Sequence, residues 1–280
     1  MKLHIVTDST CDLPEATVQH YGITILPLYI NQGDKSYLDG VDMTREEFYR
    51  RLPGFHPAPR TATPSPETFV QTWSRLAAQG AQAILSIHLS EKLSATVNAA
   101  RVAAGQFTRL PVTVLDSGQL SLGMGFIVEK AAQMAVLGHS LDEILAASRG
   151  MMKRTYVFAA IRTLEYLRRS GRMNFALARF GELLQIKPVL HMHQGNPVAH
   201  RVRTQGKATA RMFEWLAEYA PFERLAVVHA GVQPEAEELR QQIGHFFPDG
   251  EIPVVQITPV LGAHLGVGAL GFACVSAKEG

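Results

Sequence analysis

Short apolar runs that alternate with capped helices most strongly constrain how the first half of this 280-residue chain can fold. Strands alternating with helices pack as a parallel sheet with helices on both faces. Such sheets bind ligands at the carboxyl ends of their strands. The sequence therefore predicts an N-terminal three-layer α/β/α domain over residues 1–154. Its expected strands are at 3–6, 23–30, 83–87 and 112–115.

Capping residues predict where the intervening helices begin. Ser140 and Glu143 have capping-box spacing, as do Asp12 with Glu15 and Thr44 with Glu47. Ser65-Pro66 supplies an N-cap followed by a first-turn proline. Helices are expected at 12–20, from 44, at 65–79, at 94–104, at 121–137 and from 140.

The pattern changes in the second half of the chain. Strand candidates lie at 157–161, 188–192, 198–202, 225–229, 252–257 and 272–275, with helices at 209–219 and 235–246. A turn at 193–197 should join two of the strands in antiparallel sense. We therefore expect a second, mixed α/β domain over residues 155–280.

Two further segments should be loops or turns. Gln32-Gly33-Asp34 predicts a turn into a hairpin arm at 36–38. Residues 53–66 hold five prolines, which favours an extended loop without regular structure.

Composition limits the classes of function. The net charge is +2 without a block of like charges, which gives no electrostatic reason to expect nucleic acid or a membrane surface as a partner. The first strand turns polar at 7–9, so no signal peptide is expected, and no apolar run has membrane-spanning length. Cys11 and Cys274 are too few for a disulfide framework, which favours reduced thiols and a cytoplasmic location.

Residues 258–271 contain four glycines and His264, which is typical of a loop shaped around a bound group. The spacing of Gly266, Gly268 and Gly271 matches the G-x-G-x-x-G of dinucleotide-binding proteins. Only nine residues follow Gly271, which leaves no room for the required helix and acidic residue. We therefore reject the dinucleotide and expect a glycine-formed loop that presents His264.

Thr61, Ser94 and His264 each lie beside an expected strand end. Two hydroxyl donors and an imidazole could converge on a small acid group. The simpler interpretation of Thr61 and Ser94, each taken alone, is a helix cap. His264 between glycines is harder to explain by packing alone.

Other chemistries lack their motifs. The chain has no Gly-x-Ser-x-Gly elbow and no Gly-x-x-x-x-Gly-Lys-Ser/Thr loop for ATP. His191 and His193 share a strand face but have no third ligand at fixed spacing, so no metal site is expected. The arginines at 168, 169 and 172 are typical of a solvated helix end, and Arg201 and Arg203 of outward strand positions.

Several of these stretches together resemble the DegV family, the fatty-acid-binding subunits that work with a separate fatty acid kinase. The resemblance covers essentially the whole chain. It rests on Thr7-Asp8-Ser9 with Asp12-Leu13, on 61–66, on 93–96, on Asp116-Ser117, on 164–167 with Gly171-Arg172, on Lys187-Pro188, on Arg203-Thr204 and on 262–268.

The resemblance implies a long-chain fatty acid in a buried tunnel between the two domains and a carboxylate presented to an ATP-dependent kinase that makes an acyl phosphate. It implies no cofactor and no catalysis by this chain alone. The residues implicated are Thr61, Ser94 and His264 at the carboxylate, Arg172 near the head group, Arg203 at the kinase, and Gly262, Gly266 and Gly268 in shaping the loop. The alternatives are a hydrolase or acyltransferase that uses Ser94 or His264, and a lipid-responsive regulatory protein.

Overall fold

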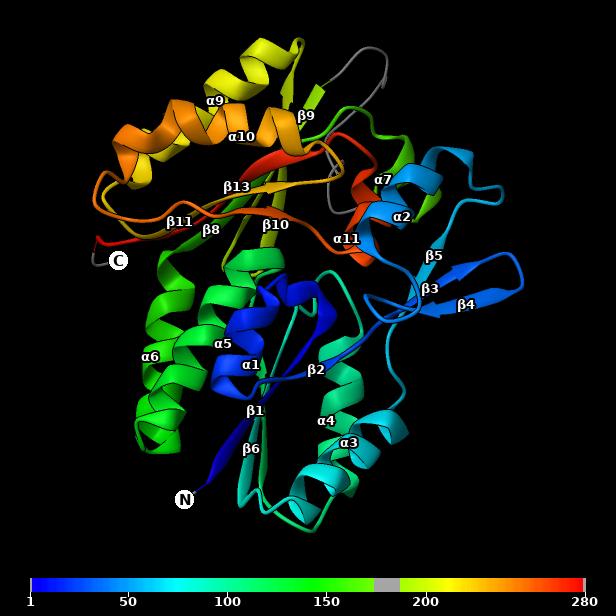
Figure 1. The fold of residues 1–280 in the computed structure, drawn as a ribbon, viewed down its shortest axis with the longest axis vertical. Helices are drawn as coiled ribbons and strands as arrows, with labels where there is room; N and C mark the ends of the chain where they lie inside the picture. Colours follow the sequence, from blue (N-terminus) through cyan, green and yellow to red (C-terminus); the bar gives the residue numbers. More distant parts are fainter. Residues whose placement is uncertain (1, 174–186, 279–280) are drawn as a thin grey trace.

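The computed structural model describes residues 2–173 and 187–278. It contains a four-stranded sheet in the lower half of Figure 1, a six-stranded sheet in the upper half, and a three-stranded sheet beside them. This is the α/β fold that the sequence predicts, with one parallel and one mixed large sheet.

The four-stranded sheet is parallel throughout, in the order β2-β1-β6-β7. Its strands are β1 (Leu3–Asp8), β2 (Thr24–Leu26), β6 (Ala83–His88) and β7 (Val112–Asp116). Val6 and Ile84 pack with α3 (Pro66–Ala78) and α4 (Thr96–Gln106) on one face. Ile5 and Leu85 pack on the other face, which α5 (Ser121–Val136) covers together with α1 (Glu15–Tyr21). The predicted three layers are therefore present.

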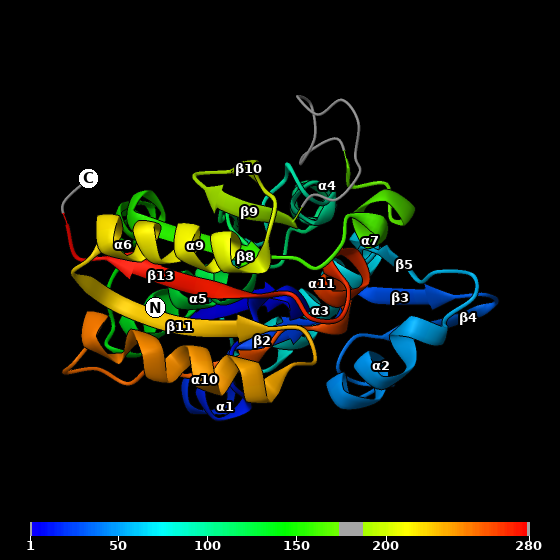
Figure 2. The same cartoon turned by 90° about the horizontal axis from the view of Figure 1, so that it is seen from above.

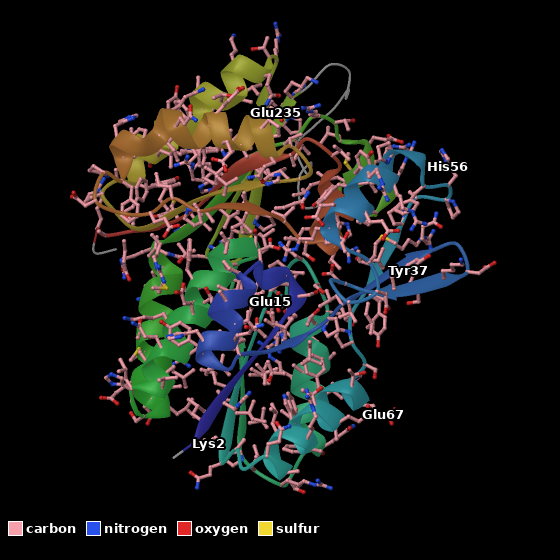
Figure 3. The ribbon with its side chains drawn as sticks, in the orientation of Figure 1. Lys2, Glu15, Tyr37, His56, Glu67 and Glu235 are labelled. Atoms are coloured by element: carbon pink, nitrogen blue, oxygen red, sulfur yellow. The ribbon has the colours of Figure 1, made fainter. Side chains whose placement is uncertain are left out.

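The six-stranded sheet has the order β10-β9-β8-β13-β11-β12 and is mixed, because β11 and β12 are parallel and the other pairs are antiparallel. Its outer face packs on α9 (Gln205–Tyr219) and α10 (Gln233–Ile243) around Phe158, Trp215 and Phe272. Helices on the outside of both large sheets carry exposed acidic side chains, such as Glu235 on α10 and Glu67 on α3 of the four-stranded sheet (Figure 3). The strands are β8 (Thr155–Ala160), β9 (Lys187–His193), β10 (Asn196–Val202), β11 (Phe222–His229), β12 (Val254–Gln256) and β13 (Leu270–Ser276).

Helix α5 lies between the two large sheets, and α6 (Leu141–Arg154) packs beside it and against β13 (Figure 1). Two glycines of α5 allow it to approach strand β8 on one side and the segment after β1 on the other. A Cβ at Gly123 would lie 2.4 Å from Val157 Cγ2, and one at Gly125 would lie 2.5 Å from the Cys11 carbonyl oxygen. One apolar core therefore joins both sheets. The division into domains at residues 154 and 155 stays a prediction.

The small sheet has the order β4-β3-β5, from β3 (Tyr29–Gln32), β4 (Lys35–Leu38) and β5 (Arg60–Ala62). Together with α2 (Arg45–Arg51) it contacts α11 (Pro259–Leu265) from the other end of the chain. Helix α11 also contacts α7 (Glu165–Arg169), and Figure 2 shows both helices next to the small sheet. Segments more than 200 positions apart in the sequence thus lie side by side.

Most predicted helix starts are confirmed. Ser140 and Glu143 form the predicted capping box, and the side chains of Thr44 and Ser65 cap α2 and α3. The capping box at Asp12 is wrong. The N-cap of α1 is Pro14, while Asp12 has a left-handed conformation at the end of the 3-10 helix η1 (Ser9–Cys11).

Three other predictions need correction. The single strand expected at 23–30 is divided between two sheets, because Pro27 has no backbone N–H to donate to a ladder. The proline-rich segment contains the 3-10 helix η2 (Leu52–Gly54) and the strand β5, whose three residues include no proline. The glycine-rich stretch is not only a loop, since residues 259–265 form α11.

Candidate functional site

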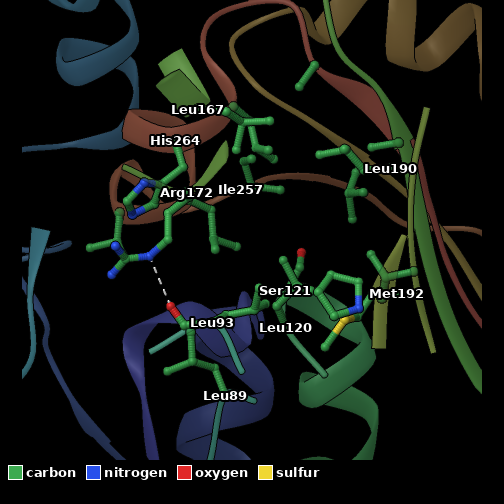
Figure 4. Close-up of a pocket in the computed structure, with 18 of the residues that line it drawn as sticks. Leu89, Leu93, Leu120, Ser121, Leu167, Arg172, Leu190, Met192, Ile257 and His264 are labelled. Atoms are coloured by element: carbon green, nitrogen blue, oxygen red, sulfur yellow. Dashed lines mark hydrogen bonds between the residues drawn. The ribbon is translucent and has the colours of Figure 1, made fainter. Parts of the chain in front are cut away.

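A cavity lies where the inner face of the six-stranded sheet meets the loops that follow the parallel strands (Figure 4). Its wall is mostly aliphatic, and residues from β8, β9, α7, α11 and the β6–α4 loop contribute to it. The carboxyl ends of parallel strands are where such sheets bind ligands. The aliphatic lining residues include Leu89, Leu93, Leu120, Leu167, Leu190, Met192, Ile257, Val260 and Leu261.

Four side chains selected from the sequence line this cavity: Thr61, Ser94, Arg172 and His264. Figure 4 shows His264 and Arg172 on one side and Leu190 and Met192 on the opposite side. We call Thr61, Ser94, Arg172 and His264 the polar end of the cavity. The region of Leu190 and Met192 is the apolar end.

Thr61 and His264 contact each other directly, although they lie 203 positions apart in the sequence. Thr61 is the middle residue of β5 and pairs with Ile30 on β3. Its Oγ1 lies 3.0 Å from His264 Nε2, so one hydroxyl and one imidazole share a hydrogen bond. Their proximity results from the packing of the small sheet against α11.

Ser94 lies in the loop between β6 and α4. Its Oγ accepts a hydrogen bond from the backbone N–H of Thr96 at 3.3 Å and lies 2.9 Å from Thr96 Oγ1. The helix-capping interpretation is therefore partly met, although the N-cap position itself is Ala95. A hydroxyl oriented by a helix start can still donate its proton into the cavity.

His264 is partly buried in the last turn of α11. Burial, followed by the nearby positive charge of Arg172, lowers its pKa to about 4, so the imidazole is neutral at pH 7. Its Nδ1 is buried without a hydrogen-bond partner among the described residues. A buried polar atom without a partner is uncommon, and a hydrogen-bonding group of a ligand would satisfy it.

Arg172 connects the polar end to the β6–α4 loop. Its Nε donates to the Leu93 carbonyl oxygen at 3.1 Å (Figure 4). The guanidinium lies close enough to His264 for its charge to act on that imidazole, and its fork of N–H donors suits an anion. Arg203, in contrast, follows β10, is exposed and does not line the cavity.

The three glycines predicted to shape the His264 segment lie in close contacts. A Cβ at Gly262 would lie 2.5 Å from Tyr49 Oη. Gly266 and Gly268 have φ of +79° and +89°, and a Cβ there would lie 2.2 Å from Tyr166 and Arg162 respectively. The G-x-G-x-x-G spacing begins at the C-cap of α11 and leads into a strand, so the strand-to-helix order of a dinucleotide site is not present.

A buried Asp–His–Ser arrangement lies at the ends of β1 and β6. Asp8 Oδ2 is 3.0 Å from His88 Nδ1, and His88 Nε2 is 2.8 Å from Ser86 Oγ. All three side chains are fully buried and none lines the cavity. Asp8 also accepts from the Leu89 backbone N–H at 3.1 Å, so the group joins the ends of two strands and has no access to a substrate.

The histidines considered as metal ligands have other partners. His191 Nε2 lies 3.1 Å from the Tyr219 hydroxyl, and His193 Nδ1 lies 3.0 Å from the Thr155 carbonyl oxygen. Among residues 2–173 and 187–278, no three His, Cys, Asp or Glu side chains form a group that could hold a metal ion. In the same part of the chain, no helix combines the length and apolar character needed to cross a bilayer.

Sequence reasoning missed part of the site. Ser121 and His229 line the cavity, and Asp12 and Asp39 form a buried network next to it. The signal for Asp12 was its place after the carboxyl end of β1, where parallel sheets gather polar groups. Asp39 had no such signal, because its role depends on the packing of the small sheet.

Comparison with known proteins identifies the family. The model of the family described as uncharacterised protein, DegV family, matches residues 2–277. The chain belongs to the DegV family. A DegV domain-containing protein of Streptomyces coelicolor is 36% identical over 272 residues, which cover 95% of this chain and 96% of that relative.

Solved DegV structures share the whole fold. A DegV family protein from Thermus thermophilus, described by its fatty acid binding, superposes with a TM-score of 0.87 at 34% identity, and the match covers 99% of this chain and 100% of the other. DegV of Bacillus subtilis, described as a fatty acid binding protein, gives a TM-score of 0.90 at 29% identity with the same coverage.

Proposed function

We propose that this DegV protein binds a long-chain fatty acid in the cavity, with its carboxylate at Thr61, Ser94 and His264. The observation that carries the proposal is a polar end built on a mostly aliphatic wall. An amphipathic molecule with one small acid group matches that division. The fatty acid binding described for the Thermus and Bacillus relatives supports the same ligand class.

The expected energies favour a lipid over a small polar acid. Burial of a methylene contributes ~0.8 kcal/mol, so a chain of about fifteen contributes on the order of 12 kcal/mol before ordering costs. A hydrogen bond to a charged group contributes about 1.5–3 kcal/mol, and desolvation of the carboxylate offsets much of this. The tail therefore sets the affinity and the polar end sets the orientation.

We further propose that the chain presents the carboxylate to a separate ATP-dependent kinase, which forms the acyl phosphate. The family resemblance supports this, and the sequence contains no phosphate-binding loop of its own. A carboxylate held in one place suits in-line attack on ATP. We assign Arg172 to the vicinity of the head group and the exposed Arg203 to the kinase contact.

The two cysteines bear on location. Cys11 and Cys274 are buried and unpaired, which fits the cytoplasmic location that a kinase using ATP requires.

The geometry gives less support to a hydrolase or acyltransferase. A nucleophilic serine needs a base within hydrogen-bond reach. His264 Nε2 is paired with Thr61, and the Ser94 hydroxyl with Thr96. An enzyme of this kind would turn over an acyl substrate without a partner, whereas the binding function predicts no turnover until a kinase and ATP are added. A regulatory role would appear as a protein partner other than a kinase.

Denaturing extraction of the purified protein, followed by mass spectrometry, tests the ligand. We expect about one long-chain fatty acid per chain. Leu190→Trp fills the apolar end and should abolish recovery, while Val136→Trp, at a side chain 67% exposed outside the cavity, should not. If wild-type protein neither contains nor binds a fatty acid, the proposed function is wrong.

A further inference from the structure

Two buried carboxylates meet at the segment that leads into α11. Asp12 and Asp39 are 1% and 3% exposed. Asp12 comes from the end of η1 and Asp39 from the loop after β4. Both accept hydrogen bonds from Thr258, the N-cap residue of α11.

Asp12 joins Thr258 to the cavity wall. Its Oδ1 accepts from the Thr258 backbone N–H at 2.7 Å, and its Oδ2 accepts from Ser121 Oγ at 2.6 Å. Ser121 lines the cavity at the start of α5 and is labelled in Figure 4. One carboxylate therefore connects a wall residue of the N-terminal half to the helix that carries His264.

Asp39 holds the Thr258 side chain. Its Oδ2 accepts from the hydroxyls of Thr258 and Ser9, the latter at 2.6 Å. The Thr258 hydroxyl accordingly makes no capping bond to α11, although threonine commonly caps helices. The Thr258 side chain therefore attaches the start of α11 to the N-terminal half and does not cap the helix.

Residues of α2 complete the attachment. The Tyr49 hydroxyl donates to the Ile257 carbonyl oxygen at 3.1 Å, and Arg45 donates to the Gln256 carbonyl oxygen. Arg45 also lies 3.3 Å from Asp12 Oδ1. The three residues before α11 are thus all bonded to groups from residues 12–49.

We propose that Asp12 and Asp39 are positioning residues that hold α11 in register and thereby place His264 at the polar end opposite Thr61. This rests on the proposed function, because the role has a consequence only if a carboxylate binds there. The α11 helix is only seven residues long, so a displacement at Thr258 is transmitted to His264.

The stability cost of the pair supports a positioning role. Burial of a carboxylate costs stability that its hydrogen bonds must offset, and the best-attested use of buried charged groups is to specify register. Burial raises the pKa of both Asp12 and Asp39 to about 6. The charged groups that act on Asp12 are Arg45 and Asp39, those that act on Asp39 are Arg45 and Asp8, and Tyr49 is packed beside both carboxylates.

The test follows the carboxyl carbon of hexadecanoic acid, labelled with ¹³C and bound to each variant. Asp39→Asn and Asp12→Asn remove one charge each with little change of shape, and Asp34→Asn changes an exposed carboxylate in the β3–β4 turn as the matched control. We expect wild type and the control to give one narrow carboxyl signal. In Asp39→Asn and Asp12→Asn the signal should broaden and its titration midpoint should rise by about one pH unit, because hydrogen bonds that hold the carboxylate ionised are lost.

Two milder variants keep the test informative if an asparagine variant does not fold. Thr258→Val and Tyr49→Phe each remove one hydroxyl of the attachment. Both should shift the carboxyl titration in the same direction, with bound stoichiometry retained. A merely structural role would lower the unfolding temperature and leave the bound carboxyl signal unchanged.

The outcomes separate the two proposals. If wild type binds the acid and the folded variants give the same carboxyl signal and titration as Asp34→Asn, the positioning role is wrong and the proposed function stands. If wild type binds no acid, both are wrong. A shifted titration in folded, loaded variants supports the positioning role.

Discussion

Replacement of Thr61 by valine separates the contribution of the polar end from that of the tail. Valine keeps the β-branched shape on β5 and removes only the hydroxyl that lies 3.0 Å from His264 Nε2. If that hydroxyl donates to the ligand carboxylate, its loss should cost about 1.5–3 kcal/mol. This corresponds to a roughly 10- to 150-fold weaker affinity.

The assay is a series of saturated fatty acids of increasing length, measured by titration calorimetry. Each methylene buried at the apolar end should strengthen binding about fourfold, since it contributes ~0.8 kcal/mol. Thr61→Val should lower every affinity by the same factor and leave this increment unchanged. Thr63→Val is the matched control, because Thr63 lies two residues further along and does not line the cavity.

Primary alcohols of the same lengths provide a second control, because they carry no charge for Thr61 to stabilise. Their affinities should fall less than those of the acids. The reasoning is refuted if Thr61→Val changes the increment per methylene, or if it weakens alcohols as much as acids. It is also refuted if the acids bind Thr61→Val as tightly as Thr63→Val.

Three further predictions concern protonation and backbone conformation. Because burial and Arg172 lower the pKa of His264 to about 4, fatty acid binding should raise that pKa, and an imidazole NMR titration without such a rise would place the carboxylate elsewhere. Burial raises the pKa of Asp39 from 3.8 to about 6, so ionisation of Asp39 opposes folding as pH rises through that range. Urea denaturation at pH 4 and pH 7 should therefore show Asp39→Asn gaining about 2 kcal/mol relative to wild type at the higher pH, and a constant difference would contradict this. Gly266→Ala should lower the free energy of unfolding by at least ~1–3 kcal/mol, because φ is +79° and Tyr166 occupies the space, whereas Gly150→Ala on the exposed face of α6 should raise it by about 0.5–1 kcal/mol. Equal unfolding temperatures for the two glycine variants would contradict that account.

The strands and helices of the N-terminal half could be predicted because each has a local cause. All six residues of β6 are buried, and its sequence begins with the apolar run 83–85, which is typical of a buried strand. The capping box at Ser140 closes the first turn of α6 with its own side chains. In both cases, residues close in sequence contain the information.

The prediction failed where distant contacts decide the local conformation. Residues 259–265 form a helix although Gly262 weakens helix formation, because Tyr49 packs against that glycine from α2. Asp12 has the spacing of a helix cap, but it accepts hydrogen bonds from Ser121 and Thr258, which lie 109 and 246 positions away. Local propensity is a weak guide when a buried charge can find partners elsewhere.

The sequence by itself determined the α/β class, the parallel and mixed character of the two halves, the family resemblance and the candidate residues Thr61, Ser94, Arg172 and His264. These follow from short-range patterns and from motifs. Only the tertiary structure decided that those four residues line one aliphatic cavity, that Arg203 lies apart from it, and that Asp12 and Asp39 hold the helix carrying His264. The physical reason is that a cavity and a buried charge network are built from side chains far apart in the chain, and only packing brings them into contact.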